Sequence, residues 1–264
     1  MVLHPLEAPA AATPEIVSAW EAVFRTQQQH SSSYWLIAQP DHAALAGDLA
    51  ANFSNPEFPE LTPEVVQAIA LHDAGWAALD IGSRDATASS GQRDGAARPL
   101  SFLYVPPKLM IDAWDGSIQR AEEVGPIGGL LVGGHFRRLG AHRLTLLQDP
   151  PEIVDLLRDF VGRQEKKDEE RLGAQSRTKE EVEALIDTLQ FCDLLSLYLC
   201  CGARENVRFP QTVGRQNIVL QNYDGQCRLH PSPFSGELSL GVGARRDPPN
   251  AGESNTMTLA FLLR

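Results

Sequence analysis

The most constraining feature of this sequence is an aspartate in the middle of an apolar helical stripe. Thr178 and Glu181 form a capping box, which predicts a helix that begins there and ends near Gly202. At roughly 100° per residue, Asp193 lies within about 20° of Val182 on the apolar face of this helix. A carboxylate that points into a core costs free energy unless it is paired or bound to a cation. The helix therefore predicts a buried charge that needs a partner.

A helix predicted over residues 40–53 presents the same conflict. Asp41 is a suitable N-cap residue for this helix. His42 then shares a face with Leu45 and Leu49, so its imidazole is directed at the interior.

Two further segments add three residues to this set. A helix predicted from Thr62 continues through the doublet His72-Asp73, whose two members straddle its apolar stripe. Residues 126–139 are apolar and glycine-rich, and a helix there places His135 on its apolar face. Four predicted helices thus each direct an imidazole or a carboxylate inward.

The combined set indicates a metal site. Imidazole nitrogen and carboxylate oxygen from separate helices are what a divalent transition metal binds, with room left for water. A single histidine or aspartate could be a hydrogen-bonded core residue, so the inference depends on the whole set. Iron, manganese, nickel and zinc are all compatible, and we expect one ion because few other histidines are available. The predicted ligands are His42, His72, Asp73 and Asp193, with His135 as a fifth.

The order of these residues resembles a known signature. His42, the doublet His72-Asp73 and the distant Asp193 resemble the H…HD…D pattern of the HD superfamily of metal-dependent phosphohydrolases. Many members of that superfamily carry a lysine shortly after the doublet, where this chain has Trp76.

A narrower resemblance covers most of the chain. The stretches QPDHAALAG, ALHDAGW followed by Asp80, and CDLLSLYLC are similar to an uncharacterised bacterial branch of the HD superfamily, known as a domain of unknown function. In that branch the histidine before Phe136 corresponds to a further inward histidine, which supports His135. The resemblance implies a mainly α fold: an HD-type helical bundle with a small antiparallel β-sheet.

We expect one HD-like domain over residues 1–264. Its metal-binding helical body would cover about 40–205, and a C-terminal β appendage would cover about 215–264. The first dozen residues read as a loose tail, whereas a strand over 33–38 can join the sheet. The C-terminal strands are predicted at 217–222, 226–230, 237–242 and 257–263.

The function implied by the resemblance is a metal-dependent phosphohydrolase. It would act on a small phosphate ester or nucleotide, with a metal-bound water as the nucleophile. Asp73 would be catalytic, holding the metal and orienting the nucleophile, while arginines neutralise the phosphate. The candidate phosphate contacts are Arg84, Arg93 and Arg98 in the loop over 80–106, and Arg137 and Arg138 beside His135.

Two alternatives stay open. Trp76, in place of the usual lysine, favours a non-catalytic HD-fold protein that binds a metabolite or nucleotide. An HD-type di-iron oxygenase would need more protein ligands than the sequence assigns. Elemental analysis of the purified protein, followed by a phosphate-release screen with the metal it prefers, would separate these functions.

Composition limits the partners. A net charge of −11 and a pI near 5.1 argue against a nucleic-acid polymer or an anionic membrane surface as partner. No apolar run approaches the roughly 20 residues that span a bilayer, and we see no signal peptide. Four cysteines without a CxxC pair predict buried, reduced thiols, although a redox or zinc–thiolate role stays open. We therefore expect a cytoplasmic protein with a small phosphate-containing ligand, and the oligomeric state stays open.

Overall fold

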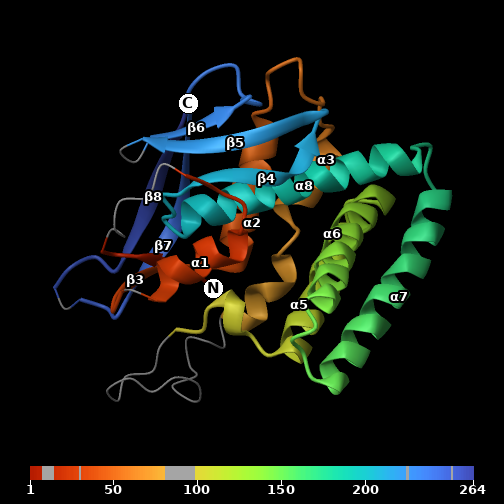
Figure 1. The fold of residues 1–264 in the computed structure, drawn as a ribbon, viewed down its shortest axis with the longest axis horizontal. Helices are drawn as coiled ribbons and strands as arrows, with labels where there is room; N and C mark the ends of the chain where they lie inside the picture. Colours follow the sequence, from red (N-terminus) through yellow and green to blue (C-terminus); the bar gives the residue numbers. More distant parts are fainter. Residues whose placement is uncertain (8–14, 30, 81–98, 224–225, 251) are drawn as a thin grey trace.

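The fold combines several helices with one large curled sheet (Figure 1). The computed structural model describes residues 1–7, 15–29, 31–80, 99–223, 226–250 and 252–264. The helices in these ranges include α1 (Trp20–Gln29), α2 (Gln39–Ala51), α3 (Pro63–Ala70), η1 (Ala74–Trp76), η2 (Phe102–Tyr104), α5 (Pro107–Glu122), α6 (Pro126–Thr145), α7 (Pro151–Gly173) and α8 (Lys179–Cys200). Residues 77–80, directly after η1, are helical as well. No helix within the described ranges is long and apolar enough to cross a membrane.

The sheet combines strands from both ends of the chain. Its order is β1-β3-β7-β8-β6-β5-β4-β2. Neighbours are antiparallel except for the pairs β2–β4 and β6–β8, which are parallel. The strands are β1 (Val2–Pro5), β2 (Ile16–Val17), β3 (Tyr34–Ile37), β4 (Asn206–Val213), β5 (Gln216–Tyr223), β6 (Gln226–His230), β7 (Leu238–Asp247) and β8 (Thr256–Leu263).

The predicted fold class is wrong. About 51 % of the described residues are helical and about 21 % are in strands. The sheet that they form has eight strands of mixed direction, so the fold is not a mainly α bundle with a small antiparallel sheet. The difference begins at the N-terminus, where residues 2–5 form β1 and pair with β3 instead of forming a loose tail. The sheet then continues from β3 into β7, whose residues lie some two hundred positions later.

Strand β4 was missed because its sequence contains a proline. Pro210 lacks a backbone donor, which argues against a regular central strand. The pairing of β4 with β5 shifts register between Arg208 and Thr212, so Pro210 lies at an irregularity where a ladder hydrogen bond is not required. The adjacent residues then pair normally, with Val207 opposite Leu220.

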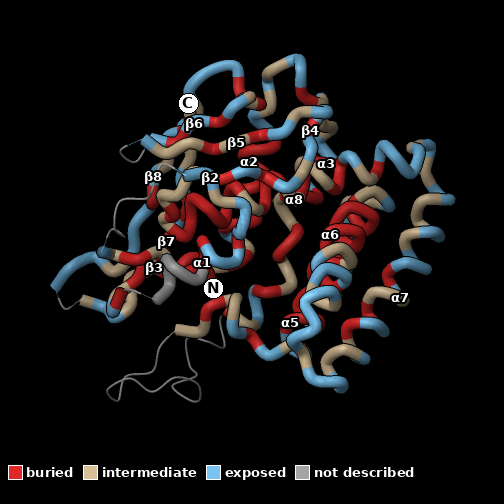
Figure 2. Tube along the Cα trace, in the orientation of Figure 1, coloured by how far each residue is buried: buried red, intermediate tan, exposed pale blue. Residues whose placement is uncertain are grey.

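Helix α8 connects the sheet to the other helices. It packs against β4 and also contacts α2, α3 and α6 (Figure 1). A single hydrophobic cluster includes Leu49 of α2, Leu131 of α6 and Leu189 of α8, together with Val207 and Leu220 of the sheet. Buried residues follow α2, α6 and α8, whereas α7 is largely exposed (Figure 2). All four cysteines are buried and free.

Glycines allow the elements around this core to approach closely. Gly75 lies in η1, directly against α5, where a Cβ atom would be 2.1 Å from the carbonyl oxygen of Ala113. Its backbone N–H donates to Ser117 Oγ at 3.0 Å. On α6, a Cβ atom at Gly134 would be 2.3 Å from Ile186 Cδ1 of α8. A larger residue at Gly75 would push η1 away from the backbone of α5, whereas at Gly134 the contact is with the end of a flexible side chain that can move.

We expect Gly75→Ala to destabilise the protein by about 1–3 kcal/mol, because the clash is with rigid backbone and not with a flexible side chain. Gly162→Ala is the matched control. Gly162 lies in α7 with no atom within 4 Å of an added Cβ, so this change should stabilise by about 0.5–1 kcal/mol. Urea unfolding of both variants measures the difference. Equal stability of the Gly75 variant and the wild type would contradict the close packing of η1 on α5.

Candidate metal centre

Five ionisable side chains meet in the interior. His42 comes from α2, His135 from α6 and Asp193 from α8, while His72 and Asp73 lie between α3 and η1. The three histidines are at most 2 % exposed, and the two aspartates are 7 % and 8 % exposed. The structure therefore brings together all five residues that the sequence predicts as ligands.

The sequence predicted that the doublet His72-Asp73 lies within a helix, and this prediction is wrong. Helix α3 ends at Ala70, and a turn carries His72 and Asp73 to η1. On a continuous helix the two side chains would point about 100° apart. The turn instead lets both reach the same point.

Two imidazole rings are oriented by their own backbone. The Nδ1–H of His42 donates to the carbonyl oxygen of Gln39 at 2.6 Å. The Nδ1–H of His72 donates in the same way to Ile69 at 2.8 Å. A carbonyl oxygen can only accept, so Nδ1 carries the proton in both rings and Nε2 presents its lone pair.

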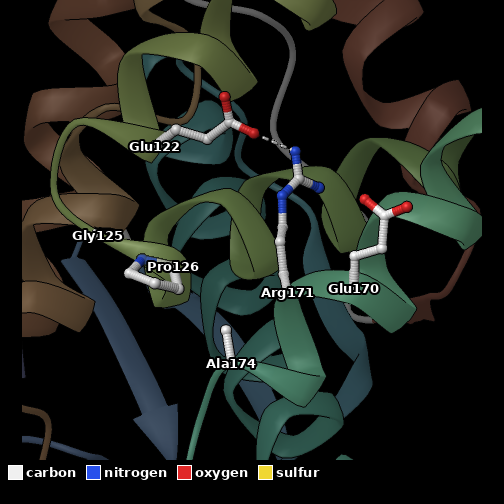
Figure 3. A pocket seen from close by; sticks show the side chains of 6 residues that line it. All are labelled: Glu122, Gly125, Pro126, Glu170, Arg171 and Ala174. Atoms are coloured by element: carbon white, nitrogen blue, oxygen red, sulfur yellow. Dashed lines mark hydrogen bonds and ion pairs between the residues drawn. The ribbon is translucent and has the colours of Figure 1, made fainter.

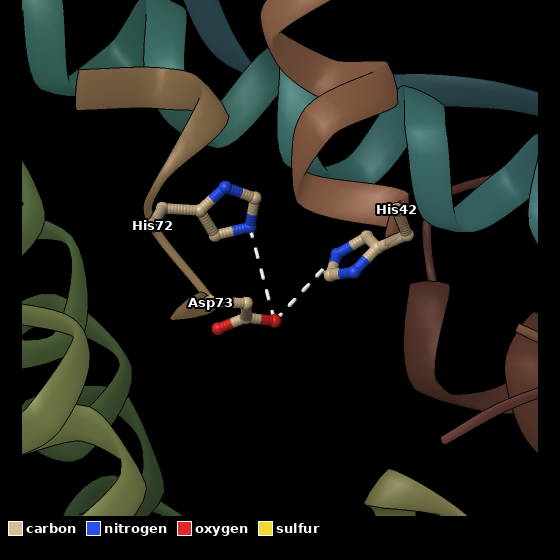
Figure 4. A group of neighbouring side chains, drawn as sticks. All are labelled: His42, His72 and Asp73. Carbon is tan, nitrogen blue, oxygen red and sulfur yellow. Dashed lines mark ion pairs between the residues drawn. The ribbon is translucent and has the colours of Figure 1, made fainter. Parts of the chain in front are cut away.

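These lone pairs face two carboxylates. Asp193 Oδ1 is 3.2 Å from Nε2 of His42 and 3.3 Å from Nε2 of His72. Asp73 Oδ2 is 3.7 Å and 3.9 Å from the same two atoms, and Figure 4 shows both rings directed at this oxygen. Atoms bound about 2.1 Å from one ion are about 3.0 Å apart at a right angle and about 3.4 Å apart at the tetrahedral angle. The separations at Asp193 match these values, and those at Asp73 are slightly longer.

The donor chemistry fits a cation. Neutral imidazole nitrogen and carboxylate oxygen are both electron-pair donors, so they repel at these distances unless a positive charge lies between them. That charge is either a proton on an imidazole or a metal ion. Within the described part of the chain, two groups of buried residues could hold a metal ion: His42 with His72 and Asp73, and His72 with His135 and Asp193.

His135 differs from the other two histidines. Its Nε2 is 3.8 Å from Asp193 Oδ2, the oxygen that does not face His42 or His72. Its Nδ1 is buried and has no hydrogen-bond partner among the described residues. The ring packs edge-on against His72, with the centroids 5.5 Å apart. No contact in the described part of the chain therefore fixes its tautomer.

Burial and the nearby charges set the pKa values of the ion-free centre. Burial lowers the pKa of His72, but the carboxylates of Asp73 and Asp193 outweigh it and raise this pKa to about 9. Burial lowers the pKa of His135 to about 3, and attraction to Asp193 does not offset it. Burial also raises the pKa of Asp73. Burial opposes ionisation of Asp193 too, yet hydrogen bonds with His42 and His72 hold its pKa well below the usual range.

Two of the candidate phosphate contacts, Arg137 and Arg138, lie among the described residues. Arg84, Arg93 and Arg98 lie outside the described residues. Arg137 is paired with Asp168 at 3.0 Å and with Glu183 at 3.3 Å. Its neighbour Arg138 is likewise paired with Glu183 and Asp187. Both side chains therefore tie α6 to α7 or α8, and neither guanidinium is free to neutralise a phosphate.

A surface pocket lies elsewhere, at the junction of α5, α6 and α7. Figure 3 shows Arg171 at this pocket, between Glu122 and Glu170. Arg171 forms ion pairs with Glu122 and Asp168. Its only cationic side chain is paired, so the pocket offers no clear anion site.

Sequence reasoning named Asp80 as part of the family resemblance but assigned it no role at the centre. Asp80 is 4 % exposed, and its Oδ2 accepts a hydrogen bond from the backbone N–H of Gln39 at 2.6 Å. Gln39, not Asp41, begins α2, and Ala38 at the N-cap offers no side-chain hydrogen bond. A buried aspartate seven residues after Asp73 was the available signal, but its partner lies 41 positions away.

Comparison with known proteins adds a family but no function. A family model described as "Protein of unknown function (DUF3891)" matches residues 25–246. This range contains all five residues of the centre. Comparisons with curated proteins and with solved structures find no match.

We expect metal binding to release about one proton per chain at pH 7.5, because the ion replaces the proton that His72 carries below pH 9. Apparent affinity should therefore rise with pH and level off above pH 9. Calorimetric titration with Zn²⁺ in buffers of different ionisation enthalpy measures the release. Identical heats in all buffers would contradict a protonated His72.

The ion-free protein should respond to pH in the opposite sense. The pKa of His72 is raised from 6.5 in the unfolded chain to about 9 in the folded one, so folding takes up a proton between these values. This stabilisation is fully present below pH 6.5 and is lost as pH rises through 9. Urea unfolding of chelator-treated protein should show stability that falls across this window, and a flat profile would argue against it.

Proposed function

This chain belongs to the DUF3891 family of proteins of unknown function, and we propose that it is a metal-dependent phosphohydrolase. Its substrate would be a small phosphate ester or a nucleotide. The resemblance of His42, His72-Asp73 and Asp193 to the HD signature supports this reaction class. The observation that carries the proposal is the convergence of two oriented imidazoles on two buried carboxylates.

We propose one divalent transition-metal ion, held by His42, His72, Asp73 and Asp193, with His135 as a fifth ligand. Iron, manganese, nickel and zinc all accept mixed nitrogen and oxygen donors. The two candidate groups share His72. The Nε2 atom of an imidazole has a single lone pair, so His72 cannot bind two ions, and both groups belong to one centre.

The two carboxylates, Asp73 and Asp193, lie on the side of the centre that a substrate would approach. The side chains of Asp73 and Asp193 keep 10 % and 11 % exposure, whereas those of His42 and His72 have none. A ligand therefore reaches the centre past the carboxylates. A divalent ion lowers the pKa of a coordinated water and polarises a phosphoryl oxygen. Asp73 Oδ1 points away from both rings (Figure 4), so it is available to accept the proton of the attacking water.

A second candidate is binding without turnover. Arg137 and Arg138, the cations nearest to His135 in the sequence, are both held by carboxylates. Without these two guanidinium groups, a site would stabilise the charge of a phosphoryl transition state less well. Such a protein would hold a metabolite or nucleotide on its metal as a sensor or scaffold.

We expect protein purified without chelator to carry about one transition-metal ion per chain and to release phosphate from at least one phosphomonoester or nucleotide. Elemental analysis and a phosphate-release screen measure the two properties. Chelation should abolish release, and adding the metal back should restore it. A fully metal-loaded protein that binds phosphate esters but hydrolyses none would support the second candidate instead.

We expect Asp193→Ala to weaken metal affinity by roughly a hundredfold or more, because Asp193 Oδ1 is the nearest anionic atom to both His42 and His72. Asp187→Ala is the matched control, since Asp187 lies on the same helix but pairs with Arg138. Competition with a chromophoric chelator measures both affinities. Full metal affinity in the Asp193 variant would make this residue a structural core carboxylate.

We expect His135→Ala to weaken metal affinity by only about tenfold, because its ring lacks the backbone hydrogen bond that orients the other two. His42→Ala should have a much larger effect. The same chelator competition compares the two variants. Equal losses would show that His135 is as important a ligand as His42.

A further inference from the structure

The first turn of α2 lacks a local cap. Ala38 is the N-cap residue and has no polar side chain. Pro40 has no backbone N–H, and the N–H groups of Asp41 and His42 donate to the carbonyl oxygen of Ala38. The N–H of Gln39 is therefore the donor at this helix end that needs an external acceptor.

Asp80 supplies that acceptor from another element. Its Oδ2 lies 2.6 Å from the backbone nitrogen of Gln39, and its Oδ1 lies 2.9 Å from the amino nitrogen of Met1. Asp80 lies on a helical segment, described over residues 77–80, which directly follows η1 and therefore the doublet. A buried negative charge at a helix N-terminus also interacts favourably with the helix dipole.

Gln39 links this cap to the metal centre. Its N–H is held by Asp80, and its carbonyl oxygen accepts from Nδ1–H of His42 at 2.6 Å. Displacement of Gln39 would therefore move the acceptor that orients the His42 ring. The segment that carries His72 and Asp73 thus also fixes the helix that carries His42.

We propose that Asp80 is a positioning residue of the metal centre, which holds the first turn of α2 and thereby aims Nε2 of His42. The proposal rests on the proposed metal-binding function of the centre. Removal of a group that orients a metal-binding histidine typically lowers metal affinity by about 10–100-fold. An ordinary helix cap would change stability alone.

Three variants separate these roles. Asp80→Ala removes the acceptor, whereas Asp80→Asn keeps an oxygen that can accept from Gln39. Thr178→Ala removes the capping-box side chain of α8, which accepts a hydrogen bond from the N–H of Glu181. This cap lies at the N-terminus of α8, several turns from Asp193. Like Asp80→Ala, this change removes a helix cap, but the cap is remote from the proposed metal ligands.

Co²⁺ affinity, the Co²⁺ absorption spectrum and thermal stability are measured for each full-length variant. We expect Asp80→Ala to bind Co²⁺ about 10–100-fold more weakly with an altered spectrum, and Asp80→Asn to stay within about threefold of wild type. Thr178→Ala should lose stability but keep wild-type affinity and spectrum. Wild-type affinity and spectrum in Asp80→Ala would overturn the proposal. If that variant does not fold, the stabilising change Gly162→Ala in α7 is added to the same chain, and the same criteria apply to the double variant.

Failure of the metal proposal gives a different result. A wild-type protein that binds no Co²⁺ rejects the metal function by itself. The role of Asp80 is then decided on the ion-free protein by the NMR signal of the His42 Nδ1–H proton. That signal should shift or broaden in Asp80→Ala and stay in place in Thr178→Ala, and an unchanged signal in both would reject the positioning role.

Discussion

The main constraint on this structure is the convergence of imidazole nitrogens and carboxylate oxygens in the interior. These electron-pair donors repel one another unless a positive charge lies between them. The Nδ1–H groups of His42 and His72 are bound to backbone carbonyls, so both rings present lone pairs to Asp193. The interior removes the water that would otherwise screen them. A proton or a metal ion must supply the missing charge. Because the donors come from α2, α8 and the segment after α3, an ion bound there would also join elements that are distant in sequence.

Helical periodicity was enough to predict the residues of the centre but not their local geometry. Asp193, His42 and His135 lie on regular helices, where phase alone determines which face a side chain occupies. The doublet was placed correctly in the interior and wrongly on a helix, because α3 ends before it. Sequence phase does not show where a helix stops when no cap or proline marks the end. The role of Asp80 could not be predicted at all, since it depends on a contact across 41 positions.

The sheet was underestimated for a related reason. A strand is stabilised by its neighbours, and here β3 pairs with β1 on one side and with β7 on the other. Residues 2–5 are too few to show an alternating pattern, and β4 contains Pro210. The strands β5, β6 and β8 alternate more clearly and were recognised. The position of α8 between this sheet and α6 explains why so much of that helix is buried around Asp193.

The ion pairs of α6 bear on how a ligand would be held. Arg137 and Arg138 follow His135 on α6, yet their guanidinium groups bind carboxylates of α7 and α8. These contacts fix α6 against α8 and therefore fix His135 relative to Asp193. They also remove two cations from the set that could neutralise an anion, in a chain whose net charge is −11. In the proposed function the metal ion is then the main positive charge that a phosphate ester meets among the described residues. Ligand affinity should consequently depend on the ion more than on any single arginine there.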